Sequence, residues 1–183
     1  KKLMKIKENV INKYLILLLS VSALLRGALA SIIEFGNDEV YYWTYAMYPD
    51  WSHFDHPPMV GLMMQLFSCN LLFTSEFFLR LSSVIFMTIN TYLVFLIGKQ
   101  VKNEQTGFYA ALLYTASIYA FVITGIFILP DTPLSIFTFL AVLQFIRYFQ
   151  NEKNKHLILA GLFAGLAMLS KYSGVFVWVG VGL

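Results

Sequence analysis

The 183-residue chain has little charge and almost no cysteine. Only 13% of its residues are charged, whereas typical soluble domains contain about 25%. The single cysteine, Cys69, excludes an intrachain disulfide and a cysteine-rich metal site. No basic stripe runs along a soluble face, so the composition argues against nucleic acid as a partner.

Apolar residues take the place of the missing charge. They make up 58% of the chain, and the mean hydropathy is +0.69. Apolar runs close to the roughly 20 residues that a membrane-spanning helix needs recur along the sequence, which predicts about five spans. We therefore expect an all-α, polytopic transmembrane helical bundle that forms one domain over residues 1–183. The expected spans are 14–33, 76–98, 106–129, 134–149, and a last one from 157 onward that is broken at 170–174.

The basic arm 1–13 and the apolar run after it have two interpretations. One is a secretory signal peptide with Ala28-Leu29-Ala30 as its cleavage site. The other is a cytoplasmic arm followed by an uncleaved first span, which we favour because the run is long for a signal peptide and further spans follow. The chain starts without Met and stops inside an apolar run. We therefore expect it to be the N-terminal part of a longer protein and to be inactive alone.

Lysine and arginine are unevenly distributed between the predicted loops. The segments predicted to lie inside, 1–13, 99–105 and 147–156, hold ten of the thirteen basic residues, whereas the predicted external segments 34–75 and 130–133 hold none. Cytoplasmic loops of membrane proteins are enriched in Lys and Arg. The sequence thus predicts a multi-pass protein of the cell inner (plasma) membrane, with a long first external loop, 34–75, that carries short interfacial helices.

The stretch 37–58, NDEVYYWTYAMYPDWSHFDHPP, is the main polar and aromatic interruption. Asp38, Tyr42 and Tyr45 follow helical spacing and are expected on one face. The aromatic residues fit either a belt at the membrane–water interface or stacking against a sugar. A carboxylate beside a low-dielectric wall can have its pKa raised toward that of a general base, which makes Asp38 and Asp131 catalytic candidates. The alternatives are a solvated loop acid and, for Asp131, a helix N-cap.

Two further sites are suggested by residue type. His53-Phe54-Asp55-His56 supplies imidazole and carboxylate groups that can bind a divalent metal, although the spacing is not a standard metal motif and an interfacial loop with hydrogen-bonded histidines is the favoured interpretation. Lys171 lies within an apolar run, where a charge is costly unless it faces a cavity or a partner. It is a candidate for binding an anionic group such as a phosphate, and the alternative is a lysine that reaches the surface from a helix end.

Four elements occur in one order along the chain. They are Asp38-Glu39-x-x-Tyr42, Phe54-Asp55-His56-Pro57-Pro58, Leu129-Pro130-Asp131-Thr132-Pro133-Leu134 and Leu169-Ser170-Lys171. Together they resemble the N-terminal part of the bacterial membrane glycosyltransferases related to protein O-mannosyltransferases and to the aminoarabinose transferase of lipid A, of the GT-C class. The resemblance covers nearly the whole chain.

The resemblance implies an inverting transfer of a sugar from a polyprenyl-phosphate donor to a protein, lipid or glycan acceptor, in contact with membrane lipids on the outer face. It implies that Asp38 is the general base and that Glu39 supports it. Asp131 matches a second acidic position, and Asp55 matches a position that contacts a metal ion, so a divalent metal is the one cofactor suggested. His56 replaces a lysine that lies near the donor phosphate, and Tyr41 replaces an arginine.

Residues with substrate-binding roles in this interpretation are Tyr42, His56 and Lys171. A secondary transporter is the main rival, since it too would have charges within the membrane and broken helices. The crowding of acids in an external loop argues against it, because transporter sites usually lie near the bilayer midplane. A polytopic subunit without catalysis is a third interpretation.

Overall fold

The computed structural model describes residues 2–182, with side chains for residues 10–180, and this part of the chain contains helices and no strand. The predicted all-α fold is confirmed. The side chains of the basic arm up to position 9 lie outside the described residues. The helices are α1 (Lys2–Ile32), α2 (Asn37–Met47), α3 (Met59–Phe67), α4 (Glu76–Val101), α5 (Glu104–Ala116), η1 (Tyr119–Ile123), α6 (Asp131–Asn151), α7 (Asn154–Ser170), η2 (Tyr172–Val175) and α8 (Phe176–Gly182).

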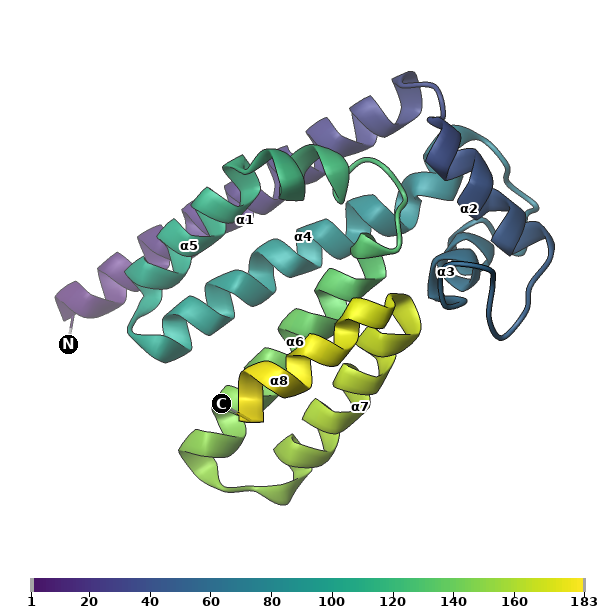
Figure 1. Ribbon diagram of the computed structural model, residues 1–183. Helices are drawn as coiled ribbons and strands as arrows, with labels where there is room; N and C mark the ends of the chain where they lie inside the picture. Colours follow the sequence, from purple (N-terminus) through teal and green to yellow (C-terminus); the bar gives the residue numbers. More distant parts are fainter. Residues whose placement is uncertain (1, 183) are drawn as a thin grey trace.

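The long helices pack in two groups that share α4. On one side α1, α4 and α5 lie side by side, and on the other α6 packs against α4 and forms a hairpin with α7 (Figure 1). The short helices α2 and α3 pack together where α1 ends and α4 begins. We call this the loop end of the bundle. It gathers residues from the first loop, from the start of α6 and from the end of α7.

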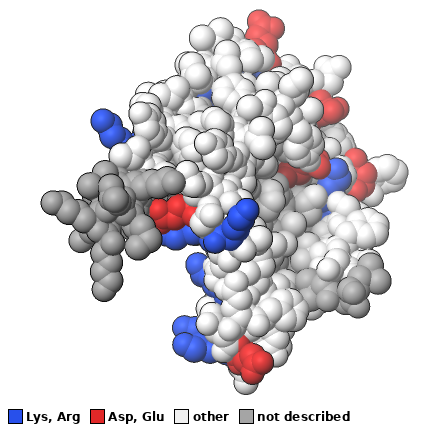
Figure 2. Space-filling model, turned by 90° about the vertical axis from the view of Figure 1, so that its left-hand side faces the viewer, with Lys and Arg blue, Asp and Glu red and all other residues white. Residues whose placement is uncertain are grey.

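Among the described residues, three helices are long and apolar enough to cross a membrane: Val10–Ile32, Glu76–Val101 and Asp131–Asn151. They correspond to the first, second and fourth predicted spans. Charged side chains form separate groups, and residues of other kinds make up most of the face in Figure 2. Such a surface is what a lipid-embedded bundle requires, because charge in the hydrocarbon region is costly.

The other two predicted spans are interrupted. The helix predicted over 106–129 ends at Ala116, because the Ser117 hydroxyl donates to the carbonyl of Tyr114 at 2.8 Å and accepts from the amide of Ala120 at 3.2 Å. Serine bonds of this kind compete with the helical ladder. The π-helix η1 follows. The expected break in the last span is confirmed: α7 ends at Ser170, and Lys171 has an extended backbone before η2 begins.

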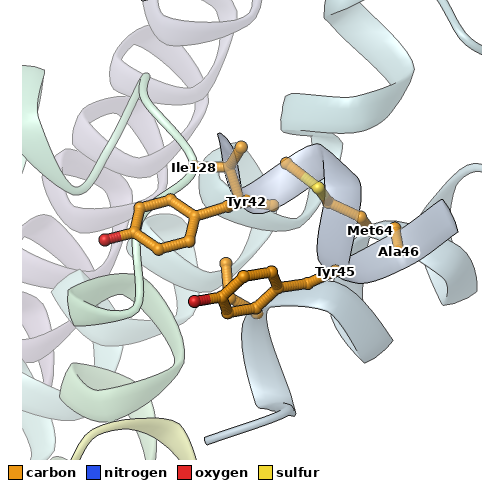
Figure 3. Close-up of a cluster of buried hydrophobic side chains, with 6 residues drawn as sticks. Tyr42, Tyr45, Ala46, Met64 and Ile128 are labelled. Carbon is orange, nitrogen blue, oxygen red and sulfur yellow. The ribbon is translucent and has the colours of Figure 1, made fainter. Parts of the chain in front are cut away.

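A glycine brings α3 against α2. A Cβ atom added to Gly61 would lie 2.8 Å from the Cβ and carbonyl carbon of Tyr45, which is too close for any other residue without a shift. The two helices therefore bury Tyr42 and Tyr45 of α2 together with Met64 of α3. Figure 3 shows both tyrosine rings extending from α2 in the same direction, with their hydroxyls pointing away from Ala46 and Met64.

Candidate active site at the loop end

Glu39 is buried in an ion pair with Arg80. The Nε and Nη2 atoms of Arg80 donate to the two carboxylate oxygens at 2.7 and 2.6 Å, and the side chains are 0% (Arg80) and 2% (Glu39) exposed. The amides of Gly36 and Ile128 each donate to one of these oxygens at 3.1 Å. Each oxygen thus accepts two hydrogen bonds. This geometry favours the supporting role expected for Glu39 over direct proton transfer.

Arg80 uses its remaining donors on the end of α1. Its Nη1 atom donates to the carbonyl oxygens of Ala30 and Ile33, and its Nη2 atom donates to that of Glu34 at 3.0 Å. Carbonyl groups in the last turn of a helix otherwise lack partners. The Glu39–Arg80 pair therefore fixes the end of α1, the start of α2 and the segment before α6 relative to one another.

Asp38 differs from its neighbour Glu39 in burial and in hydrogen bonding. It lies exposed in the first turn of α2, and within the described part of the chain its carboxylate makes no hydrogen bond or ion pair. The same turn is held rigidly by Glu39. Asp38 is thus an accessible carboxylate with free lone pairs on a fixed backbone, which is what a general base requires.

Three carboxylates surround the buried phenol of Tyr42. Burial raises the pKa of Tyr42 to about 12, and the negative charges of Asp55, Asp38 and Asp131 act in the same direction. These acids come from the first loop, from α2 and from α6. The structure therefore brings together three of the predicted site residues around a fourth, Tyr42.

Asp55 is held by two tyrosines that the sequence did not single out as site residues. The hydroxyls of Tyr41 and Tyr45 both donate to its Oδ1 atom, the former at 2.9 Å, and the two hydroxyl oxygens lie 3.0 Å apart. The bond from Tyr45 lowers the pKa of Asp55 below its usual range, and the bond from Tyr41 adds to this effect. Asp55 therefore stays ionised well into the acid range.

The histidines of the loop pack against the same tyrosines. The His53 ring stacks on Tyr45 with centroids 3.7 Å apart, and the Nε2 atom of His56 lies 3.9 Å from the Oδ2 atom of Asp55. In the part of the chain that the structure describes, no group of three or more His, Cys, Asp or Glu residues could hold a metal ion. A metal ion bound at Asp55 would therefore need further ligands from the substrate or from another segment.

Asp131 and Lys171 form a second ion pair. The Nζ atom of Lys171 lies 3.1 and 2.9 Å from the two oxygens of Asp131, and the side chains are 32% (Lys171) and 23% (Asp131) exposed. Tyr119 of η1 donates to the Oδ1 atom of Asp131 at 2.9 Å. Asp131 is the first residue of α6 and makes no capping bond, and Lys171 stands at the break after α7. The charge of Lys171 is therefore neutralised by Asp131 within the bundle.

An apolar groove of about 580 Å³ is lined by residues that closely follow Asp131 and Lys171 in the chain. It lies between α6 and the η2–α8 segment and runs from Leu134, one turn after Asp131, to Phe149 near the other end of α6. Ser173, two residues after Lys171, also lines it. The groove thus begins near the loop end of the bundle, where Asp131 and Lys171 form their pair.

Several residues of the site carried little sequence signal. Arg80 is 41 positions from Glu39 and stands in an apolar stretch, and Tyr119 is 12 positions from Asp131. Tyr45 was expected on the face of Asp38 and Tyr42, but its bond to Asp55 depends on how the loop folds back. Lys171 and Asp131 were predicted separately, and their pairing was not.

Comparison with known proteins gives one match. Residues 55–182 match the family model described as dolichyl-phosphate-mannose-protein mannosyltransferase. The matched part contains Asp55, His56, Asp131 and Lys171, whereas Asp38 and Glu39 precede it. Neither the curated proteins nor the solved structures gave a match.

Proposed function

The chain belongs to the dolichyl-phosphate-mannose-protein mannosyltransferase family, and from this premise we propose that it transfers a sugar from a polyprenyl-phosphate donor to an acceptor hydroxyl at the outer face of the membrane. Membership makes it a membrane glycosyltransferase of the mannosyltransferase kind. The donor, the acceptor (protein, lipid or glycan) and the face are the proposed part. The loop end of the bundle is the proposed site.

One observation supports the choice of donor: residues that closely follow Asp131 and Lys171 in the chain line an apolar groove. The cavity of about 580 Å³ lies between α6 and the η2–α8 segment, and Leu134 and Ser173 are among its lining residues. A polyprenyl phosphate has the matching form, with a long apolar chain and an anionic head. The prenyl chain would lie along Leu134, Val142 and Phe149, and the phosphate would replace Asp131 as the partner of Lys171.

The proposed transfer step gives one role to Asp38 and another to Lys171. Asp38 accepts the proton of the acceptor hydroxyl as its oxygen bonds to the anomeric carbon. The bond from that carbon to the phosphate oxygen breaks, and the polyprenyl phosphate leaves with the electron pair. Lys171 stabilises the charge that develops on the leaving phosphate. Attack opposite to the leaving group inverts the anomeric carbon.

The remaining residues bind and position. Tyr42 lies among Asp38, Asp55 and Asp131, and its phenol, which stays protonated at neutral pH, can donate to a sugar hydroxyl. His56 lies beside Asp55 at the same site and would contact the donor head. Glu39 holds the turn that carries Asp38. The metal role predicted for Asp55 would need ligands from the substrate or from another segment.

A transfer assay tests the proposal. Membranes that contain the full-length protein are given a radiolabelled polyprenyl-phosphate sugar or the corresponding nucleotide sugar. We expect label to reach an acceptor from the polyprenyl donor alone. Equal or faster transfer from the nucleotide sugar in membranes depleted of polyprenyl phosphate would contradict the proposed donor.

Thiol labelling tests the face. With the exposed Cys69 changed to Ser, single cysteines are placed at Ser52 in the first loop and at Asn103 between α4 and α5, both of which are exposed. An impermeant thiol reagent added to intact cells should label position 52 and leave position 103 unlabelled until the membrane is opened. The reverse pattern would place the site on the cytoplasmic face.

A further inference from the structure

A second buried arginine, Arg26 of α1, has no counter-charge. Its side chain is 0% exposed, and none of its three guanidinium nitrogens has a hydrogen-bond partner among the described residues. The guanidinium carbon lies 5.0 Å from the centre of the Phe121 ring in η1. Arg80, equally buried, makes five hydrogen bonds. An ionisable residue inside a membrane helix that lacks such partners is a functional-site candidate.

The acids at the loop end do not supply the missing partner. Glu39 is saturated by Arg80, Asp131 pairs with Lys171, and Asp55 is bound by tyrosines. Within the part of the chain that the structure describes, no carboxylate forms an ion pair with Arg26. A counter-charge for Arg26 therefore has to come from outside the described residues.

Two apolar grooves border Phe121, the ring that this arginine faces. One, of about 360 Å³, lies between Leu17, Val21 and Leu25 of α1 and the residues Thr115 and Phe121. The other, of about 350 Å³, runs along α5 and η1 and is also lined by Thr115 and Phe121. Phe121, on which the guanidinium lies, therefore borders both grooves. Their lining is almost wholly apolar, which suits hydrocarbon chains better than water.

The depth of Arg26 suits a lipid head group. It lies six residues before the end of α1, which is about 9 Å along the helix axis at about 1.5 Å per residue. The span Val10–Ile32 is 23 residues long, so it is slightly longer than a hydrocarbon core of about 30 Å. The guanidinium is buried against Phe121 at this depth, so a head-group phosphate has to enter the bundle below the end of α1 to reach it.

We propose that Arg26 binds the phosphate of a membrane phospholipid whose acyl chains occupy the two grooves between α1, α5 and η1. The Phe121 ring moves aside when the phosphate enters, and the guanidinium then makes paired hydrogen bonds to two phosphate oxygens. Basic pockets between membrane helices bind lipid head groups in this way. The site lies on the α1–α5 side of the bundle and is separate from the groove between α6 and the η2–α8 segment, so it does not depend on the proposed transferase activity.

Native mass spectrometry of the protein purified from membranes tests this site, with phosphatidylglycerol as the probe. We expect Arg26→Gln to bind this lipid at least about tenfold more weakly, which corresponds to about 1.4 kcal/mol. Arg26→Lys should retain part of the affinity. The matched control is Lys13→Gln, which removes a charge from the exposed other end of the same helix and should leave binding unchanged. Diacylglycerol with the same acyl chains should bind as weakly as phosphatidylglycerol does to Arg26→Gln.

A groove variant keeps the test decisive if Arg26→Gln does not fold. Val21→Trp fills the groove and leaves Arg26 in place, and it should also weaken phosphatidylglycerol binding. Unchanged binding in a folded Arg26→Gln protein, or in Val21→Trp, would overturn the proposal. So would displacement of the lipid by inorganic phosphate at equal concentration, since that would indicate a simple anion site. A change of oligomeric mass in Arg26→Gln with lipid binding intact would assign Arg26 to a protein partner instead.

Discussion

The loop end contains two ion pairs that differ in burial and in spare bonding capacity. Glu39 and Arg80 are almost fully buried, and each carboxylate oxygen accepts two hydrogen bonds. Asp131 and Lys171 are about a quarter to a third exposed. The first pair cannot exchange partners without leaving a buried charge, whereas in our proposal the second exchanges its carboxylate for a substrate phosphate. Burial thus separates a pair that holds the fold from one that we propose binds substrate.

The largest effect is expected on stability, at the buried pair. Glu39→Gln leaves the Arg80 guanidinium buried without its counter-charge, and breaking a buried pair in this way costs about 3–5 kcal/mol. We expect a large fall in the thermal unfolding midpoint of the purified protein. Glu34→Gln is the control, because Glu34 is exposed and contacts Arg80 only through its backbone carbonyl. Equal midpoints for the two variants would show that the Glu39–Arg80 pair does not hold the junction.

The next effect is expected on activity, at the exposed pair. Lys171→Met removes the cation proposed for the leaving phosphate, and losing one such electrostatic contact costs about 10²–10³ in rate. Stability should change by only about 1 kcal/mol or less, because the pair is partly solvated. Transfer rates and unfolding midpoints are measured together. Lys99→Met removes a lysine from the exposed Lys99–Glu104 pair at the other end of the bundle, and it should keep full activity.

If both Lys171→Met and Lys99→Met lost transfer activity, the effect would reflect the loss of a positive charge anywhere on the protein and not a contact with the donor. A Lys171→Met protein that transfers at the normal rate would remove Lys171 from the donor site.

A smaller effect is expected at Asp55, and it depends on pH. The pKa of Asp55 is lowered in the folded protein, so its hydrogen bonds stabilise the fold above the pKa of the unfolded chain, about 3.9. This stabilisation is lost as pH falls through the folded pKa. Tyr45→Phe removes the strongest of these bonds and should cost about 1 kcal/mol at pH 7, a low value because Asp55 is exposed. The difference from the unmodified protein should disappear in strong acid.

Unfolding midpoints measured across this pH range check the expectation at Asp55. Tyr48→Phe serves as control, since Tyr48 is 75% exposed. If Tyr45→Phe lowered the unfolding midpoint equally at every pH, the loss of stability would come from packing of the ring and not from the bond to Asp55.

The helices were largely predictable from sequence, and the contacts between them were not. Apolar runs located α1, α4 and α6, because length and hydropathy suffice for a span. The break after Ala116 was missed because it depends on one serine whose bonds compete with the helix. Lys171 was predicted to need a partner, since a charge in an apolar run does. Its pairing with Asp131 across 40 positions depends on how α6 and α7 pack.

The same limit applies to the two neighbouring acids of α2. Asp38 and Glu39 have similar chemistry and adjacent positions, so sequence alone gave both catalytic roles. Helical geometry turns Glu39 inward to Arg80 and leaves Asp38 exposed. Nothing in the sequence indicated that Arg80 belongs to the site, because its partners include backbone carbonyl groups at the end of α1.

Turnover of the Asp38→Asn variant in the full-length protein tests the central claim most directly. Asparagine keeps the size of the side chain but cannot accept the proton, and a general base typically contributes 10²–10⁴-fold to rate. The account predicts a fall in turnover of about this size, with donor binding and the unfolding midpoint unchanged, and nearly full activity for Asp50→Asn in the same loop. Equal turnover in the two variants, or loss of donor binding in Asp38→Asn, would contradict the assignment of Asp38 as the base.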